Sequence, residues 1–321
     1  MKRITTLKAT LWCFLVLTLL LNVIAYNHAY KFTHFPEGGY KQKLEDMSLW
    51  RKATVVFAGI DNPRPKNTST PNGEYETVYI QSEELIEGWV VRATEEKGVV
   101  ILYHGYSGNK SGNIQYGQQF NRLGYTTLLI DFRGSGGSTG NTTTIGFKEA
   151  QDVAASYAYA SHNFPNQPIV LFGSSMGAVA VMKAIDEYKI EPEKVILECP
   201  FGTMKQTVNN RFSAMGLPSF PFADLLMFYG GVQNGFNAFA HNPVDYSRSI
   251  TVPTLLIYGR KDERVSMNEI ESIYRNLPGE KELVVLPESG HDNYLEHSSE
   301  VWKASVEEYL QFDGTTTDTA H

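Results

Sequence analysis

The chain has 321 residues, of which 42% are hydrophobic and 20% charged, a composition typical of a globular protein with a sizeable core. Its formal net charge of -7, with no Lys/Arg block beyond the first eight residues, argues against nucleic-acid binding, which requires a concentrated basic face. Its two cysteines, Cys13 and Cys199, are too few for a disulfide framework or a zinc site, and we expect Cys199 to be a buried, inert thiol.

Residues 1–29 are predicted to be a membrane anchor or a signal segment. An uncharged run over residues 9–26 is about 18 residues long, roughly 27 Å as a helix and just enough to cross a bilayer core. Three basic residues precede it and favour a cytoplasmic N-terminus, with the rest of the chain outside the cytoplasm: Lys2, Arg3 and Lys8. The alternatives are a secreted protein, cleaved near Ala25, and a buried helix of the domain.

Residues 30–73 show no strand periodicity and are predicted to be a linker region. A short amphipathic helix is expected at 41–55, and 61–73 is rich in Pro, Asn, Thr and Ser, which is typical of a loop. We expect the catalytic domain to span 74–312, followed by a polar tail over residues 313–321.

From residue 74 onward, short β-rich runs alternate with helical stretches. The runs at 76–82 and 85–93 predict an antiparallel pair. Six more apolar runs predict buried strands, at 98–105, 126–132, 168–173, 195–199, 253–259 and 282–287. The stretches between and after them predict helices, at 112–123, 146–161, 176–188, 266–276 and 299–311. This alternation indicates a mostly parallel eight-stranded sheet with helices on both faces.

An insertion at about 200–250 interrupts this alternation and is rich in aromatic residues. Its rings are Phe201, Phe212, Phe220, Phe222, Phe228, Tyr229, Phe236 and Phe239. Because each would leave a large apolar area in water, the segment must pack onto something. We expect a small lid whose own helices pack together, with two or three rings lining an apolar substrate pocket.

Residues 173–177, GSSMG, match G-x-S-x-G where a buried strand meets a helix. That setting is the one the motif requires: a sharp turn exposes the serine, and glycines allow the backbone to come close. The helix N-terminus also points N–H groups at a developing oxyanion. The motif therefore predicts Ser175 as a nucleophile.

A serine hydroxyl needs a base, and His291 in ESGHD follows the last predicted strand. The base needs a carboxylate to hold its tautomer, and Asp262 follows the preceding strand, which gives the order Ser, Asp, His. Two rivals for the acid remain, Glu198 and Glu263. We therefore predict the triad Ser175, Asp262 and His291.

The run His104-Gly105-Tyr106 follows another buried strand. Here the backbone N–H of Tyr106 is predicted to pair with that of Met176 as an oxyanion hole, and His104 is expected to be structural. The alternative is a simple strand-ending turn.

The glycine-rich run 131–138 lacks the lysine of a phosphate loop and is interpreted as structural. We expect Arg133 within it to pair with a carboxylate such as Glu149 or Asp152. The sequence shows no metal-ligand spacing and no cofactor motif.

Six motifs together resemble the membrane-anchored Bem46-like hydrolases of the α/β-hydrolase superfamily, close to the serine aminopeptidase and monoacylglycerol lipase-like groups. They are HGYSGNKSGN, DFRGSGGSTG, GSSMG, LECPF, YGRKDERV and SGHDN, within roughly 74–312. The resemblance implies the same triad, the same oxyanion donors and an N-terminal anchor, but it does not select a substrate.

These observations predict a serine hydrolase that cleaves an ester or thioester with an apolar acyl group. A serine peptidase using the same triad is the alternative, and a catalytically inactive binding module is a remote one. The expected partners are a small-molecule or lipid-like acyl substrate and a membrane; we expect no nucleic acid, no cofactor and no metal.

Overall fold

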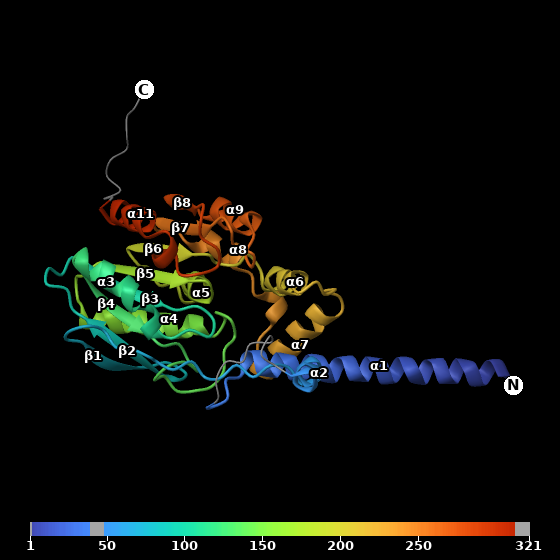
Figure 1. The fold of residues 1–321 in the computed structure, drawn as a ribbon. Helices are drawn as coiled ribbons and strands as arrows, with labels where there is room; N and C mark the ends of the chain where they lie inside the picture. The colour runs from blue at the N-terminus through green and yellow to red at the C-terminus, as the bar shows by residue number, and fades with distance from the viewer. Residues whose placement is uncertain (1, 39–47, 312–321) are drawn as a thin grey trace, which may run out of the picture. The chain divides into compact units, whose positions relative to one another are not determined.

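The computed structural model describes residues 2–38 and 48–311 (Figure 1). The chain divides into two compact units: Met1–Arg64 with Met204–His241, and Pro65–Thr203 with Asn242–His321. The first unit thus joins parts that the sequence analysis assigned separately to the anchor, the linker region and the insertion.

The second unit contains one eight-stranded sheet. Its strands are β1 (Glu76–Gln81), β2 (Leu85–Val91), β3 (Gly98–Tyr103), β4 (Tyr125–Ile130), β5 (Ile169–Ser174), β6 (Lys194–Glu198), β7 (Thr254–Gly259) and β8 (Lys281–Leu286). They lie in the order β1-β2-β4-β3-β5-β6-β7-β8. β2 is antiparallel to both β1 and β4, and every other neighbouring pair is parallel. The expected mostly parallel sheet and its antiparallel edge pair are confirmed.

Helices of the second unit cover both faces of this sheet. They are α3 (Ile114–Arg122), α4 (Glu149–Asn163), α5 (Met176–Tyr188), α8 (Pro243–Tyr246), α9 (Met267–Asn276), α10 (Tyr294–His297) and α11 (Ser299–Gln311), with short 3-10 turns at Lys110–Asn113 and Ser247–Ser249. α3 and α11 share one core cluster with the central strands, in which Trp302 and Phe172 are buried. α4 and α5 pack against each other and against the central strands, outside that cluster.

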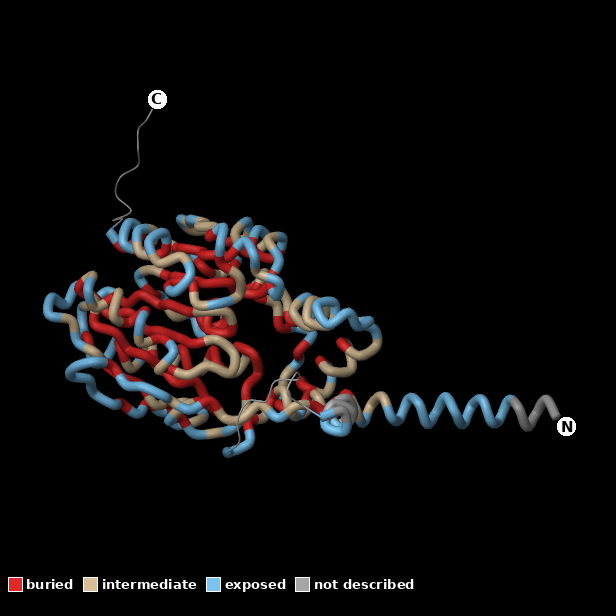
Figure 2. Tube along the Cα trace, in the orientation of Figure 1, coloured by how far each residue is buried: buried red, intermediate tan, exposed pale blue. Residues whose placement is uncertain are grey.

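Burial along the strands explains why their positions could be predicted. β3 and β7 are buried at every residue, as strands covered on both faces must be. β1 lies at the sheet edge, and only alternate residues within it, Val78 and Ile80, are buried. Figure 2 shows the buried trace running through the middle of the sheet.

The first unit is helical. It contains α1 (Lys2–Thr33), α2 (Leu49–Ala58), α6 (Met204–Ala214), α7 (Phe222–Asn234) and a 3-10 turn at Ala238–Ala240. α1 is longer than the predicted apolar run, and α7 packs along it. A helix was expected at 41–55; α2 begins at Leu49, after its N-cap Ser48, and ends at Ala58, while 41–47 lie outside the described residues. The Oγ of Ser48 accepts from the N–H of Arg51 at 3.3 Å.

Both ends of the insertion are joined by backbone hydrogen bonds. The N–H of Met204 donates to the carbonyl of His241 at 3.1 Å, within the first unit. Just outside it, the N–H of Val244 donates to the carbonyl of Gly202 at 3.1 Å, within the second. The chain therefore enters and leaves this segment at adjacent points.

Candidate active site

Ser175 occupies the turn between β5 and α5 in a strained backbone conformation. Its φ of 53° and ψ of -112° are unfavourable for a residue with a Cβ, and such outliers cluster at functional sites. Two glycines make the turn possible: a Cβ on Gly173 would lie 2.6 Å from the nitrogen of Ala178, and one on Gly177 would lie 2.5 Å from the carbonyl of Tyr103. The glycines of G-x-S-x-G are thus required because backbone approaches backbone here.

The three predicted triad residues meet in the second unit. Ser175 Oγ lies 3.0 Å from His291 Nε2, and His291 Nδ1 lies 2.7 Å from Asp262 Oδ2. The Asp262 side chain is fully buried and that of His291 is 14% exposed. Both distances are those of good hydrogen bonds, so the arrangement links a hydroxyl, an imidazole and a carboxylate in series.

The carboxylate of Asp262 is held by the loop that carries it. Its second oxygen, Oδ1, accepts from the N–H of Arg264 at 2.7 Å and from that of Val265 at 2.9 Å. Its own N–H donates to the carbonyl of Gly259, the last residue of β7, at 3.1 Å. Since Oδ1 is engaged by two backbone donors, Oδ2 is fixed toward His291.

Parallel strands bring these residues together. Ser175 follows β5, Asp262 follows β7 and His291 follows β8, so all three leave the carboxyl ends of strands in one sheet. Open α/β sheets bind their ligands at this edge.

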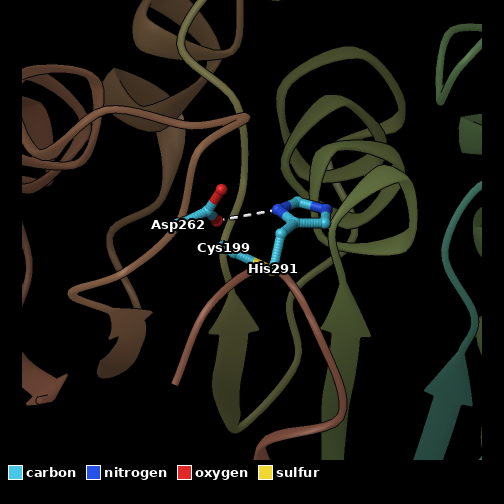
Figure 3. A group of neighbouring side chains, drawn as sticks. All are labelled: Cys199, Asp262 and His291. Carbon is cyan, nitrogen blue, oxygen red and sulfur yellow. Dashed lines mark hydrogen bonds and ion pairs between the residues drawn. The ribbon is translucent and has the colours of Figure 1, made fainter. Parts of the chain in front are cut away.

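The buried side chain of Cys199 lies against Asp262 and His291 (Figure 3). Cys199 follows β6 and has a φ of 38°. Its sulfur, a carboxylate oxygen of Asp262 and a ring nitrogen of His291 all lie within 4.8 Å of one another. The prediction that this thiol is buried is confirmed, but its position beside the imidazole was not expected. Burial lowers the pKa of His291, whereas Cys199 and Asp262 raise it, and the balance is a raised pKa.

Thiolate, carboxylate and imidazole are also the ligands of zinc, so this cluster is the candidate metal centre among the described residues. A tetrahedral ion about 2.1 Å from each atom would hold two ligand atoms about 3.4 Å apart. His291 Nδ1 and Asp262 Oδ2 are 2.7 Å apart, which is a hydrogen-bond separation. The donor set is therefore arranged for a proton between imidazole and carboxylate.

The two rival carboxylates lie elsewhere. Glu198 is fully buried, accepts from Trp302 Nε1 at 2.6 Å and from the Tyr116 hydroxyl at 3.2 Å, and burial raises its pKa to about 8. Its backbone carbonyl accepts from the N–H of Ser175 at 2.8 Å, so it supports the turn through its main chain. Glu263 is exposed.

His104 supports the loop that carries Tyr106. His104 Nε2 accepts from the N–H of Phe132 at 3.1 Å, which leaves Nδ1 as the protonated nitrogen, 2.8 Å from the carbonyl of Gly105. Burial lowers the pKa of His104, in keeping with this neutral tautomer. A Cβ on Gly105 would lie 3.5 Å from Ser175 Cβ, so the Tyr106 loop begins beside the nucleophile. Met176 is the first residue of α5, and its N–H has no carbonyl one turn earlier within the helix.

The glycine-rich loop 131–138 is held by ion pairs, as its structural interpretation predicts. Arg133 Nη2 lies 2.7 Å from Asp152 Oδ1, one of its two expected partners, and Arg133 Nη1 lies 2.6 Å from Glu83. The other expected partner, Glu149, instead accepts from Thr143, Thr144 and Gly146.

Sequence reasoning missed Lys110, which is fully buried and contacts both Asp131 and Glu87. Its ammonium also lies 4.2 Å from the centre of the Trp89 ring. This network ties the loop after β3 to the loop after β4.

The insertion contains an apolar pocket of about 480 Å³ within the first unit. Residues of α7 and the turn after it line the pocket: Met227, Phe228, Gly231, Val232, Gly235, Phe236, Asn237, Ala238 and Phe239. Three of the aromatic residues noted in the sequence therefore surround a hollow within the insertion itself.

Comparisons with known proteins agree with this fold. The family model for serine aminopeptidases, S33, matches residues 94–227, and that for PhoPQ-activated pathogenicity-related protein matches 236–311. YqkD of Bacillus subtilis is 25% identical over 236 residues, covering 73% of this chain and 77% of the relative. Lysophosphatidylserine lipase ABHD12 of Danio rerio is 23% identical, covering 58% of this chain and 49% of that one. Among solved structures, the Pyrococcus furiosus esterase Pf2001 is similar with a TM-score of 0.66 and 27% identity, covering 78% of this chain and 96% of the esterase.

Proposed function

Since this chain is a member of the α/β-hydrolase superfamily, we propose that it is a serine hydrolase that cleaves carboxylic esters or thioesters with an apolar acyl group. The observation that carries this proposal is the hydrogen-bonded series from Ser175 through His291 to Asp262. We assign Ser175 as nucleophile, His291 as general base and Asp262 as the acid that orients it.

In the acylation step, Ser175 Oγ attacks the carbonyl carbon of the substrate while its proton passes to His291 Nε2. The negative charge that develops on the carbonyl oxygen is stabilised by the backbone N–H groups of Tyr106 and Met176. The tetrahedral intermediate collapses, and the leaving alkoxide or thiolate takes the proton from His291. Asp262 holds Nδ1 protonated throughout, so Nε2 is the atom that accepts and returns the proton.

The deacylation step repeats these moves with water. Water attacks the acyl carbon and its proton passes to His291 Nε2, the oxyanion forms in the same place, and collapse releases the carboxylic acid as Ser175 regains its proton. No metal or cofactor enters this scheme.

The apolar acyl group is proposed from the insertion and from the relatives. The insertion contains an aromatic pocket, and the similar proteins include an esterase and a lysophosphatidylserine lipase. Pockets of this size and lining suit alkyl chains better than charged groups.

We further propose that α1 anchors the protein in a membrane and that the second unit, which carries the sheet and the triad, lies outside the cytoplasm. Leu7–Thr33 is long and apolar enough to span a bilayer, and basic residues precede it. The chain should remain in the pellet after alkaline carbonate extraction, and external protease should digest it in intact cells or spheroplasts. A chain released by carbonate, or one protected from external protease, would contradict the anchor or its orientation.

The test of the catalytic assignment is covalent labelling with a fluorophosphonate probe, which reacts with activated serines. Ser175→Ala should abolish labelling, while Ser174→Ala, its neighbour in the same turn, should still label. Labelling of Ser175→Ala at the original rate would mean that another serine is the nucleophile. A panel of esters of increasing acyl length then defines the substrate class, and we expect kcat/KM to rise with chain length.

A serine aminopeptidase is the second candidate, because the matching family model carries that description. Such an enzyme must bind a substrate ammonium group, yet Asp224 is the only carboxylate within 204–241 and lies 3.3 Å from Lys205. Aminoacyl anilides compared with acyl esters of equal length distinguish the two candidates, and we expect the esters to be preferred.

A further inference from the structure

We propose that the face of α7 bearing Phe228 and Val232 lies in the lipid bilayer beside α1, so that the insertion is a membrane-embedded element. This inference rests on the proposed membrane anchor and goes beyond it. It concerns α1 and α7, which belong to the same compact unit.

The first step is the length of α1 that is bare. Every residue from Leu7 to Leu20 is exposed, and most of their side chains are large and apolar. The long exposed stretch of α1 is visible in Figure 2. The charge of Lys8 belongs outside the hydrocarbon, so the bare part that can span it is the 12 residues of 9–20, which measure about 18 Å at 1.5 Å per residue. A hydrocarbon core is about 30 Å thick, so the bare part of α1 is too short by about 12 Å.

The missing length has to come from the next part of α1, which is where α7 packs. From Leu21 onward one face of α1 is covered, with Ala25 and Ala29 buried, whereas Val23 and Tyr26 stay exposed. Lys8 fixes the near boundary of the bilayer, because its charge belongs outside the hydrocarbon. About 20 residues counted from there end near His28, so a spanning α1 takes the adjoining turns of α7 into the bilayer with it.

The contacts between the two helices suit that environment. Tyr229 donates its hydroxyl proton to Asn22 Oδ1 at 2.7 Å, and Gln233 donates to the carbonyl of Tyr26 at 2.9 Å. A side-chain amide such as Asn22, placed in an apolar spanning helix, needs such a partner, and hydrogen bonds of this kind join helices in membranes. Tyr26 and Tyr229 also meet edge to face at 5.6 Å, as aromatic residues gather where lipid meets water.

The outer face of α7 has the composition that lipid contact requires. Phe228 and Val232, one turn apart, are 51% and 62% exposed, and Phe239 beyond the helix is 50% exposed. All three also line the apolar pocket. An exposed apolar patch around an apolar hollow is unfavourable in water and favourable against acyl chains. The occupant of this surface is therefore the hydrocarbon of the bilayer, and the pocket behind it suits one of its chains.

The test places an environment-sensitive probe on this face in the full-length protein. Val232→Cys is labelled with NBD in a Cys13→Ser background, where the remaining Cys199 is buried, and the protein is reconstituted into phosphatidylcholine vesicles. Doxyl-labelled phosphatidylcholine should quench the fluorescence at least about twofold, and iodide in the water should not. Tyr79→Cys, on an exposed β1 residue of the other unit, is the matched control, which iodide should quench and doxyl lipid should not.

Bilayer thickness supplies the second arm. In shorter-chain phosphatidylcholine the bare part of α1 comes closer to spanning alone, so doxyl quenching at position 232 should weaken and iodide quenching should rise. If iodide quenched the probe at position 232 in the thicker bilayer and doxyl lipid did not, the proposal would be overturned. The bilayer would then have become thinner around a short membrane-spanning helix. Failure of the anchor itself is separate: the chain would then not stay with the vesicles at all. Loss of fluorophosphonate labelling would concern only the catalytic assignment.

Discussion

Replacement of Asp262 by Asn tests the acid of the proposed triad, and the structure predicts which way the new amide must face. Oδ1 of Asp262 accepts two backbone N–H groups, from Arg264 and Val265. An amide can keep those bonds only with its oxygen on that side, which turns its NH2 group toward His291 Nδ1.

That orientation imposes the wrong tautomer on the imidazole. Nδ1 must then accept, so the proton of the neutral ring moves to Nε2, which faces Ser175 at 3.0 Å and can no longer take the hydroxyl proton. On the serine-protease template this change costs about 10⁴ in kcat, or roughly 5.5 kcal/mol of barrier. We expect a loss of at least about 10²-fold in kcat on a small activated ester, with KM nearly unchanged.

The assay compares Asp262→Asn with Glu198→Gln and Glu263→Gln, each corrected for its folded fraction. The two glutamate variants should keep most of the activity, because neither carboxylate contacts His291 in the structure. A nearly normal kcat for Asp262→Asn, together with a large loss of kcat for Glu198→Gln, would refute the reasoning. The acid of the triad would then be Glu198, at the end of the strand before the insertion.

Three further predictions concern the surroundings of the site. Burial raises the pKa of Glu198 to about 8 from its ordinary 4.5, so between these values the folded state keeps a proton that the unfolded state loses. The free energy of unfolding should therefore fall as the pH rises from 4.5 to 8, by an amount on the order of several kcal/mol. Urea unfolding in detergent at pH 5 and pH 8 should show this fall in the parent chain and no such fall in Glu198→Gln. Cys199 raises the pKa of His291, and the neutral imidazole is the active form. Cys199→Ala should therefore move the acidic limb of the pH profile of kcat/KM to lower pH, with little change in the maximum value. An unchanged limb would mean that the sulfur does not affect the pKa of the imidazole. Gly177→Ala should lower the free energy of unfolding by about 1–3 kcal/mol or prevent folding, because the new Cβ would clash with backbone atoms of β3. Gly112→Ala is the control: a Cβ there meets nothing within 4 Å, so the melting temperature should be nearly unchanged.

The sheet and the triad geometry were accessible from sequence for a shared physical reason. Strands such as β3 and β7 are buried on both faces and read as continuous apolar runs, and α5 begins and ends as predicted. Ser175, Asp262 and His291 each follow such a run, so the rule that parallel strands share one carboxyl edge was enough to group them.

Other features depend on contacts that no local pattern records. Lys110 resembles a solvated loop residue in the sequence, and in the structure it is paired with Glu87, which lies within β2, and with Asp131, which directly follows β4. Cys199 lies beside His291, and its φ of 38° after β6 is a conformation that no local sequence pattern indicates. The pairing of α1 with α7 joins segments about 200 residues apart, through hydrogen bonds such as Tyr229 to Asn22.

The closed ends of the insertion make it a natural cassette for protein engineering. Because Val244 and Gly202 are already bonded across its base, the sheet-bearing unit loses little conformational freedom if 204–241 is replaced by a short turn or by the matching segment of a relative. The same geometry would let related proteins differ in this segment while the residues at the strand ends stay where they are.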